Sequence, residues 1–167
     1  MPEITTELIK DLRARTSAGV MDCKKALEET DGDVEKAETL LKEKGIASAA
    51  KKADRDTDQG LVDTYIHSGG RIGAMIEINC ETDFVARTDD FASLAHDIAM
   101  QVAAMSPTLL TIEDASENEN ATEDQCLLSQ PFIKDPSKTI QDLINETVGK
   151  LGENIRVRRF QRFSLGE

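Results

Sequence analysis

The side chains best suited to catalysis or metal binding in this sequence are two histidines and three cysteines, and they are widely spaced. His67 and His96 have no cysteine or serine at a spacing typical of nucleophilic catalysis. Cys23, Cys80 and Cys126 form no CxxC pair, so the sequence favours neither a zinc site nor a disulfide framework. It also has no GxxxxGK loop to hold the phosphates of a nucleotide. We therefore expect no catalytic residues, no metal ion and no cofactor.

A thiol enzyme is the alternative that the cysteines leave open. Cys80 is the last residue of a core-facing alternation, a position typical of a buried and unreactive thiol. Fast reaction of Cys23 or Cys80 at neutral pH would support the thiol enzyme.

The stretch with the strongest functional pattern is Glu81–Arg87, which reads Glu-Thr-Asp-Phe-Val-Ala-Arg. Before it, apolar and polar residues alternate through 71–80 with Met75 as the exception, which predicts a half-buried strand. After it, a helical repeat of apolar residues begins near Thr88. Thr82–Ala86 therefore lies between a rigid strand and a rigid helix, a position suited to holding a side chain at a fixed angle.

Phe84 has two interpretations within this stretch. It is either a core residue that anchors the turn or an exposed residue that contacts a partner. Asp83 beside it must stay hydrated or paired, which favours a turn at the surface. Val85 and Ala86 flank any helical face that would bury Phe84, and they favour the exposed position as well.

Composition narrows the class of protein. The chain has 167 residues, enough for one medium domain or for a small and a medium one. The net charge of −12 disfavours broad binding to nucleic acid and to anionic membranes. No apolar run approaches the roughly 18 residues of a membrane span, and the first residues lack a secretory signal. The odd, scattered cysteines fit a reducing compartment, so we expect a cytoplasmic protein.

Residues 1–45 are predicted to form a small domain of three helices, with Gly45 as the stop of the third. Such a bundle has a very small core and is suited to presenting a surface. Val20 and Met21 lie at a loop-to-helix corner, where they are either core or exposed. Lys24 is one of two adjacent lysines, a pattern typical of a solvated face. Residues 46–59 are interpreted as a linker, with room for a partial helix.

Residues 60–167 are predicted to form a second, α+β domain. We expect an antiparallel sheet of strands at 61–67, 71–80 and 154–165, joined in part by a Ser-Gly-Gly hairpin. Helices at about 88–105 and 139–150 should cover one face. The acidic range 113–124 is predicted to be a solvated loop.

The last strand has an irregular pattern. Ile155, Val157, Phe163 and Leu165 share one face, but Phe160 lies with the arginines of the other face. Either a bulge shifts the register or both faces are partly covered. The arginines also leave RNA binding open as a weak alternative, whereas pairing with the chain's own excess carboxylates is favoured.

Taken together, these motifs resemble those of bacterial translation elongation factor Ts, and the resemblance covers essentially the whole length of the sequence. An N-terminal motif carries the resemblance through Leu12-Arg13, Thr16, Ala18-Gly19, Met21–Leu27 and Gly32-Asp33. A second motif is found at Tyr65–His67 and Glu77–Ala86, and a third at Gly152–Arg159. The motifs occur in the order in which the family has them.

The resemblance implies a guanine-nucleotide exchange factor that releases GDP from elongation factor Tu without covalent chemistry. The N-terminal bundle would resemble a ubiquitin-associated domain, with Arg13, Val20, Met21 and Lys24 facing that GTPase. Thr82, Asp83, Phe84, Val85 and Ala86 would act beside its magnesium site. The competing hypothesis is a ubiquitin-associated-type adaptor or scaffold without exchange activity.

The sequence departs from longer family members in one respect. Longer members carry a second core module, a coiled-coil insertion and a C-terminal module, whereas the given sequence resembles the short, single-module class. Members of that class can pair as homodimers, and we expect the same here.

Overall fold

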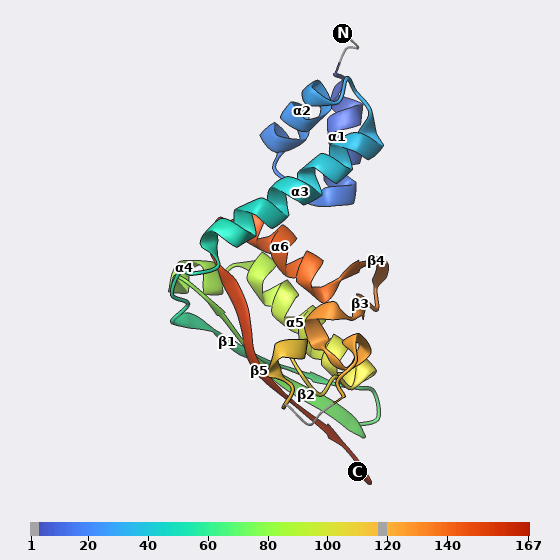
Figure 1. Ribbon diagram of the computed structural model, residues 1–167, viewed down its shortest axis with the longest axis vertical. Helices are drawn as coiled ribbons and strands as arrows, with labels where there is room; N and C mark the ends of the chain where they lie inside the picture. Colours follow the sequence, from blue (N-terminus) through green and yellow to red (C-terminus); the bar gives the residue numbers. More distant parts are fainter. Residues whose placement is uncertain (1–3, 117–119) are drawn as a thin grey trace. The chain divides into compact units, whose positions relative to one another are not determined.

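The computed structural model describes residues 4–116 and 120–167 (Figure 1). These residues form two compact units. The first comprises the chain up to Asp54 together with Asn145–Gly152, and the second comprises Arg55–Ile144 together with Glu153–Glu167. The predicted domain ranges of 1–45, 46–59 and 60–167 stay a prediction. Within the described residues, no helix combines the length and the apolar character that crossing a membrane requires.

Three helices make up most of the first unit: α1 (Thr6–Thr16), α2 (Val20–Glu29) and α3 (Val34–Lys52). Side-chain caps begin two of them, because Thr5 accepts a hydrogen bond from the Leu8 N–H and Asp33 accepts one from the Lys36 N–H. The apolar faces of the helices form a small core of Leu12, Cys23, Ala26, Leu27 and Ala37. The predicted three-helix bundle is confirmed.

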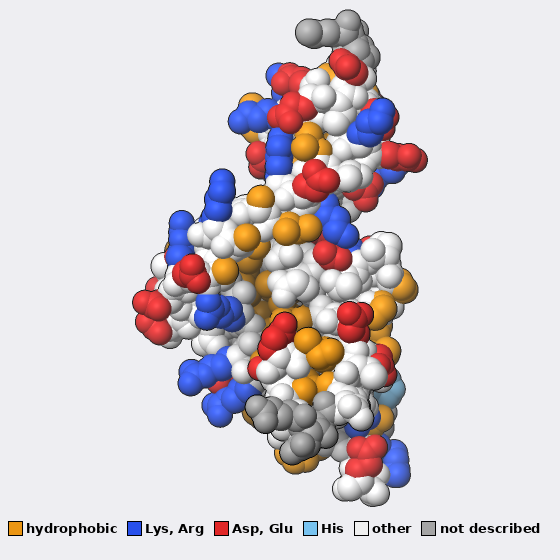
Figure 2. Space-filling model, viewed as in Figure 1, with side chains coloured by type: hydrophobic (Ala, Val, Ile, Leu, Met, Phe, Trp, Pro, Cys, Tyr) orange, Lys and Arg blue, Asp and Glu red, His pale blue; other side chains and the backbone are white. Residues whose placement is uncertain are grey.

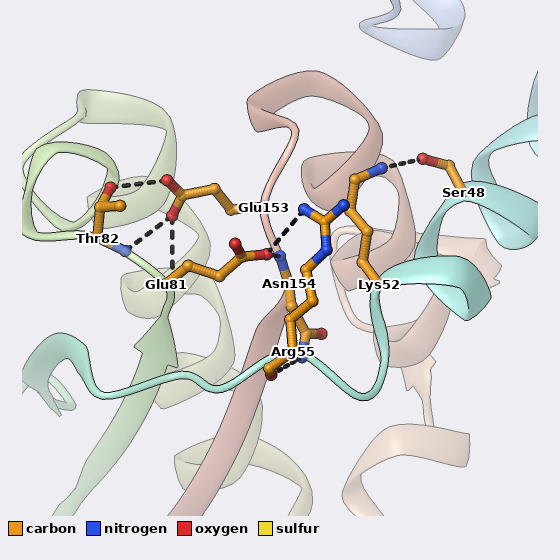
Figure 3. Close-up of polar contacts among 7 residues, drawn as sticks. All are labelled: Ser48, Lys52, Arg55, Glu81, Thr82, Glu153 and Asn154. Atoms are coloured by element: carbon orange, nitrogen blue, oxygen red, sulfur yellow. Dashed lines mark hydrogen bonds and ion pairs between the residues drawn. The ribbon is translucent and has the colours of Figure 1, made fainter.

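Helix α3 is longer than predicted, and the expectation that Gly45 stops it is wrong. Gly45 does not take the positive φ of a helix-terminating glycine. The residues after it are rich in alanine and lysine, both strong helix formers, so one glycine does not end the helix. In its last turn Lys52 Nζ donates to Ser48 Oγ (Figure 3). Half of the predicted linker is therefore helical.

The second unit is built on a three-stranded antiparallel sheet in the order β1-β2-β5. Its strands are β1 (Gln59–Ile66), β2 (Ile72–Cys80) and β5 (Ile155–Ser164). A Cβ on Gly60 would lie 2.1 Å from the carbonyl oxygen of Ile78, so only glycine fits this close approach between β1 and β2. The predicted α+β class and the antiparallel arrangement of the three strands are confirmed.

One face of the sheet is covered by α5 (Asp89–Met105), which contacts all three strands (Figure 1). The helix buries Phe91, Leu94, Ala95, Ile98 and Val102. The sheet buries Ala74, Ile76, Ile78 and Cys80, the residues that alternate in the sequence. The one-turn helix α4 (Asp83–Ala86) joins β2 to α5. The strongest sequence pattern thus forms the core that supports the Thr82–Ala86 stretch.

The chain between α5 and β5 forms shorter elements. They are the 3-10 turns η1 (Ile112–Asp114), η2 (Glu123–Gln125) and η3 (Leu127–Ser129), the strands β3 (Pro131–Phe132) and β4 (Asp135–Thr139), and α6 (Ile140–Leu151). Residues 117–119 of the predicted acidic loop lie outside the described residues. A helix at 139–150 is confirmed as α6, and its predicted packing on the sheet stays a prediction. The β3–β4 hairpin was not predicted, because β3 has only two residues and the polar sequence of β4 shows no apolar alternation.

A bulge in β5 decides which side chains face outward. Ile78 pairs with Val157 but Glu77 pairs with Arg159, so Arg158 is the extra residue. The bulge returns Phe160 to the partly covered face. It also turns Phe163 and Leu165 outward, where they are 69% and 63% exposed. The expectation that Phe163 and Leu165 share a face with Ile155 and Val157 is therefore wrong.

Three arginines of β5, namely Arg158, Arg159 and Arg162, pair with carboxylates of the chain itself, as the sequence analysis favours. Glu77 Oε2 accepts a hydrogen bond of 2.7 Å from Arg159 Nε, and Arg158 Nη1 lies 3.5 Å from Glu77 Oε1. Arg162 pairs with Glu167 at 3.1 Å. On the face of the first unit seen in Figure 2, acidic and basic side chains are interspersed.

Candidate functional site

The turn between β2 and α5 holds one large apolar side chain out in solvent. Thr82 caps α4, since its Oγ accepts a hydrogen bond from the Val85 N–H. Val85 is 5% exposed and anchors the turn in the core, whereas Phe84 is 78% exposed. Phe84 is thus not a core residue, and that alternative is wrong. An exposed aromatic ring on a short, anchored turn is suited to insertion between elements of a partner.

Asp83 occupies the first helical position of this turn, and its carboxylate pairs with Arg87 at 3.0 Å. Both side chains are largely exposed. An acid at this position also interacts favourably with the N–H groups of the first turn. The carboxylate of Asp83 is thus both hydrated and paired, as the sequence analysis expects. It lies next to the exposed ring of Phe84.

Cys80 is the last residue of β2, just before the turn, and it is fully buried. Its thiol donates to the carbonyl oxygen of Thr82 at 3.1 Å. Burial, and then the nearby charge of Glu153, raises the pKa of the Cys80 thiol to about 11. Burial also raises the pKa of Cys23. A thiolate is the reactive form of cysteine, so this environment disfavours the thiol-enzyme alternative for either residue.

Two carboxylates hold the N-terminal side of the turn, and we call Glu81 and Glu153 the carboxylate clasp (Figure 3). Glu153 Oε2 accepts from the N–H of Thr82 at 3.0 Å and from that of Glu81 at 3.2 Å. Its Oε1 accepts from the Thr82 hydroxyl at 2.7 Å. In return, Glu81 Oε1 accepts from the Asn154 N–H at 2.7 Å and lies 3.4 Å from Arg55 Nη1.

The clasp was not predicted from the sequence, although both residues lie in the motifs quoted above. Glu81 follows β2 and Glu153 precedes β5, and they are 72 residues apart. Residues just beyond the paired ends of two antiparallel strands lie close together. The sequence would therefore have indicated this contact if it had revealed that β2 pairs with β5.

The four N-terminal site residues come from the last turn of α1 and the first turns of α2. Arg13 and Lys24 are exposed, and Val20 and Met21 are 46% and 61% exposed. Lys24 lies 3.8 Å from Glu28, a weak pair on the same helix. Val20 and Met21 are not core residues, and Cys23 takes the buried position beside them.

Both histidines lie near Tyr65. His67 Nδ1 lies 3.2 Å from the Tyr65 hydroxyl, and the His96 ring meets the Tyr65 ring edge-on with 5.7 Å between centroids. His96 Nδ1 is 3.6 Å from a carboxylate oxygen of Asp63. Among the residues that the structure describes, neither histidine ring hydrogen-bonds to a cysteine or serine side chain, as a nucleophile–base pair would require. Across residues 4–116 and 120–167, His, Cys, Asp and Glu side chains form no group of three that would hold a metal ion.

Comparison with known proteins places this chain in a family. The model of the family "Elongation factor TS" matches residues 6–124 and 117–167. The elongation factor Ts of Carboxydothermus hydrogenoformans is 48% identical, over 98% of this chain and 90% of the relative. That of Coprothermobacter proteolyticus is 48% identical, over 99% and 100%. That of Thermosynechococcus vestitus is 48% identical over the whole chain and 67% of the relative.

These matches define a translation factor that acts in the elongation stage of protein synthesis. The chain belongs to the bacterial elongation factor Ts family.

Proposed function

We propose that this chain is a guanine-nucleotide exchange factor for elongation factor Tu and that it acts in the cytoplasm. The observation that carries the proposal is Phe84, an exposed phenylalanine on a turn that the core anchors on both sides. Family membership supports the class of activity. The reaction makes and breaks no covalent bond, so the chain is not an enzyme in the chemical sense.

In the proposed mechanism Phe84 enters the partner between two of its helices near the bound magnesium ion. Magnesium requires near-ideal octahedral geometry and tolerates little movement of its ligands. Burial of a phenylalanine stabilises the complex by roughly 1.5–3 kcal/mol, enough to compete with local packing in the partner. Asp83 brings a negative charge to the same place, and Thr82, Val85 and Ala86 hold the two side chains.

Linkage sets the direction of the cycle. A factor that weakens nucleotide binding must itself bind more weakly, by the same ratio, when nucleotide is present. Rebinding of nucleotide therefore releases the factor, and one molecule can act repeatedly. This gives turnover with no metal ion or cofactor in the factor itself.

The first unit would hold the partner's nucleotide-binding domain. Arg13, Val20, Met21 and Lys24 are exposed and combine apolar with basic side chains. Exposed apolar residues at a helix start are suited to fill a shallow pocket, and the two cations suit an acidic rim. In this proposal the chain contacts elongation factor Tu and does not bind nucleic acid directly.

We also propose a homodimer, paired through the face of the sheet opposite α5. Val62, Ile66, Met75 and Phe163 are exposed there on neighbouring strands, and Leu165, just after β5, is exposed beside them. A groove of about 350 Å³ runs between the ends of these strands. A soluble protein rarely leaves such a contiguous apolar face uncovered.

Light scattering at micromolar concentration should give the dimer mass, and Met75→Lys should give the monomer mass. A monomer mass for the unaltered chain, alone and with the partner, would refute pairing.

Release of a fluorescent GDP from elongation factor Tu tests the exchange activity itself. Addition of the chain should accelerate release, and the acceleration should saturate with its concentration. The competing hypothesis of a ubiquitin-associated-type adaptor predicts binding with an unchanged release rate. An unchanged rate at a concentration that saturates binding would overturn the proposed function.

A further inference from the structure

The turn that presents Phe84 is too short to hold its own shape. Helix α4 has four residues, Asp83–Ala86, and a single helical turn is unfavourable in isolation because nucleation fixes several residues for few hydrogen bonds. Phe84 contributes little packing, since it is mostly exposed. The orientation of Phe84 therefore depends on Val85, which is buried, and on the cap residue Thr82.

Besides the Cys80 thiol, which donates to its carbonyl oxygen, one side chain holds Thr82, that of Glu153. The Thr82 hydroxyl accepts from the Val85 N–H, inside the turn, and donates to Glu153 Oε1. Its own N–H donates to Glu153 Oε2. A single carboxylate thus accepts hydrogen bonds from both the backbone N–H and the side-chain hydroxyl of the cap. Hydrogen bonds with an ionised acceptor are shorter and stronger than neutral ones.

The residues on either side of Glu153 fix its position at the start of β5. Gly152 has φ +78° and ends α6, and Asn154 is buried at the start of β5. Asn154 Nδ2 donates to the carbonyl oxygen of Arg55 at 2.9 Å, and its N–H donates to Glu81. The last paired residues of the two strands are Cys80 and Ile155. Beyond that pair, the carboxylate clasp takes the place of the backbone carbonyls as acceptor.

We propose that Glu153 is a positioning residue for exchange: it holds Thr82 and so sets the direction in which Phe84 leaves the surface. This inference rests on the proposed function, because it assigns Glu153 an effect on GDP release that passes through Phe84. Glu153 need not touch the partner for this effect.

Two substitutions separate the contributions of Glu153. Glu153→Ala removes all three acceptor contacts. Glu153→Gln keeps an oxygen for the two N–H groups but places an amide nitrogen against the Thr82 hydroxyl and removes the charge. Glu123→Ala and Glu123→Gln are matched controls, since Glu123 is an exposed acid of the same unit. The readouts are melting temperature and release of fluorescent GDP from elongation factor Tu.

We expect Glu153→Ala to slow stimulated release about tenfold, the scale of one lost hydrogen bond to a charged group. Glu153→Gln should lie between Glu153→Ala and the unaltered chain, and both Glu123 variants should match the unaltered chain. If Glu153→Ala fails to fold, Glu153→Gln must still slow release with a melting transition retained.

A cycle with Phe84→Ala distinguishes positioning from a general loss of structure. If Glu153 acts through Phe84, adding the Glu153 substitution to Phe84→Ala should change release less than about twofold. The loss of melting temperature should be the same in both backgrounds. An equal slowing in both backgrounds would overturn the inference.

The outcomes separate this inference from the proposed function. If the unaltered chain accelerates release and Phe84→Ala slows it, but both Glu153 variants act like the unaltered chain, the inference fails alone. If the unaltered chain does not accelerate release, the proposed function fails and the inference fails with it.

Discussion

Two helix starts lie six residues apart in this chain, and they use the same local pattern for different ends. Thr82 caps α4 and Thr88 caps α5, each accepting a 3.3 Å hydrogen bond from the third helical residue. That third residue is buried in both, Val85 at 5% exposed and Phe91 at 0%. The second residue is exposed in both, and it is Asp90 in α5 but Phe84 in α4.

The difference shows that the backbone decides which position is exposed and the sequence decides what is displayed there. In α5 the large aromatic occupies the buried position and a charged residue the exposed one, as folding alone would favour. In α4 the aromatic occupies the exposed position. The fold does not need Phe84 there, which is why we interpret it as a contact residue.

The largest expected effect belongs to the buried aromatic. Phe91→Ala should lower the free energy of unfolding by about 3–5 kcal/mol, because it opens a cavity between α5 and the sheet. Urea unfolding followed by circular dichroism would measure the change. A loss below about 1 kcal/mol would mean that the core tolerates this cavity and that burial does not separate the two aromatics.

The two caps should differ in function but not in stability. Thr82→Ala and Thr88→Ala should each lower the free energy of unfolding by about 1 kcal/mol, since each removes a cap hydrogen bond. Thr82→Ala should in addition slow stimulated GDP release, and Thr88→Ala should leave it unchanged at matched binding. Equal release rates for the two variants would remove the functional distinction between the helix starts.

Asp83→Ala should have a smaller effect on the fold. Its partner Arg87 is exposed, and surface ion pairs contribute about 0–1 kcal/mol, so the melting temperature should change little. Stimulated release should slow, in the same direction as for Phe84→Ala. Arg87→Ala is the control that breaks the same pair while it keeps the acid. If both variants slow release equally, the ion pair matters and the charge of Asp83 does not.

A separate prediction is a pH dependence of stability that involves Cys80, the last residue of β2. Burial, then the charge of Glu153, raises the pKa of Cys80 to about 11 in the folded state, above the ordinary thiol value of about 8.5. The folded state therefore holds this proton more tightly. The resulting stability is complete below the unfolded pKa and is lost as the pH rises toward the folded pKa. Urea unfolding of Cys80→Ala should show a flatter loss across that window than the unaltered chain.

Much of the fold follows from local patterns in the sequence. Alternation through 71–80 predicted β2, and helical spacing predicted α5 and α6. The bulge at Arg158 was only one of two options, because a register shift depends on the partner strand. The full length of α3 does not follow from local signals, because Gly45 is a common helix stop and the helix-forming residues after it override it.

The sequence predicted the surface position of the Thr82–Ala86 turn but not the contacts that support it. The sequence indicated Thr82–Ala86 as a surface turn, and the exposure of Phe84 agrees with this. Glu153 was missed because its effect depends on a pairing between strands that are 72 residues apart. Periodicity describes neighbours along the chain, and it carries no information about such contacts.

Phe84→Ala tests the central claim most directly, with melting temperature of the free chain and GDP release from elongation factor Tu measured on the same preparation. The fold should be nearly unchanged, since Phe84 is exposed. Binding should weaken by about 2 kcal/mol or more, the scale of an interface hot spot, and release should slow accordingly. A large fall in melting temperature with an unchanged release rate would contradict the account, because Phe84 would then hold the fold together and would not drive exchange.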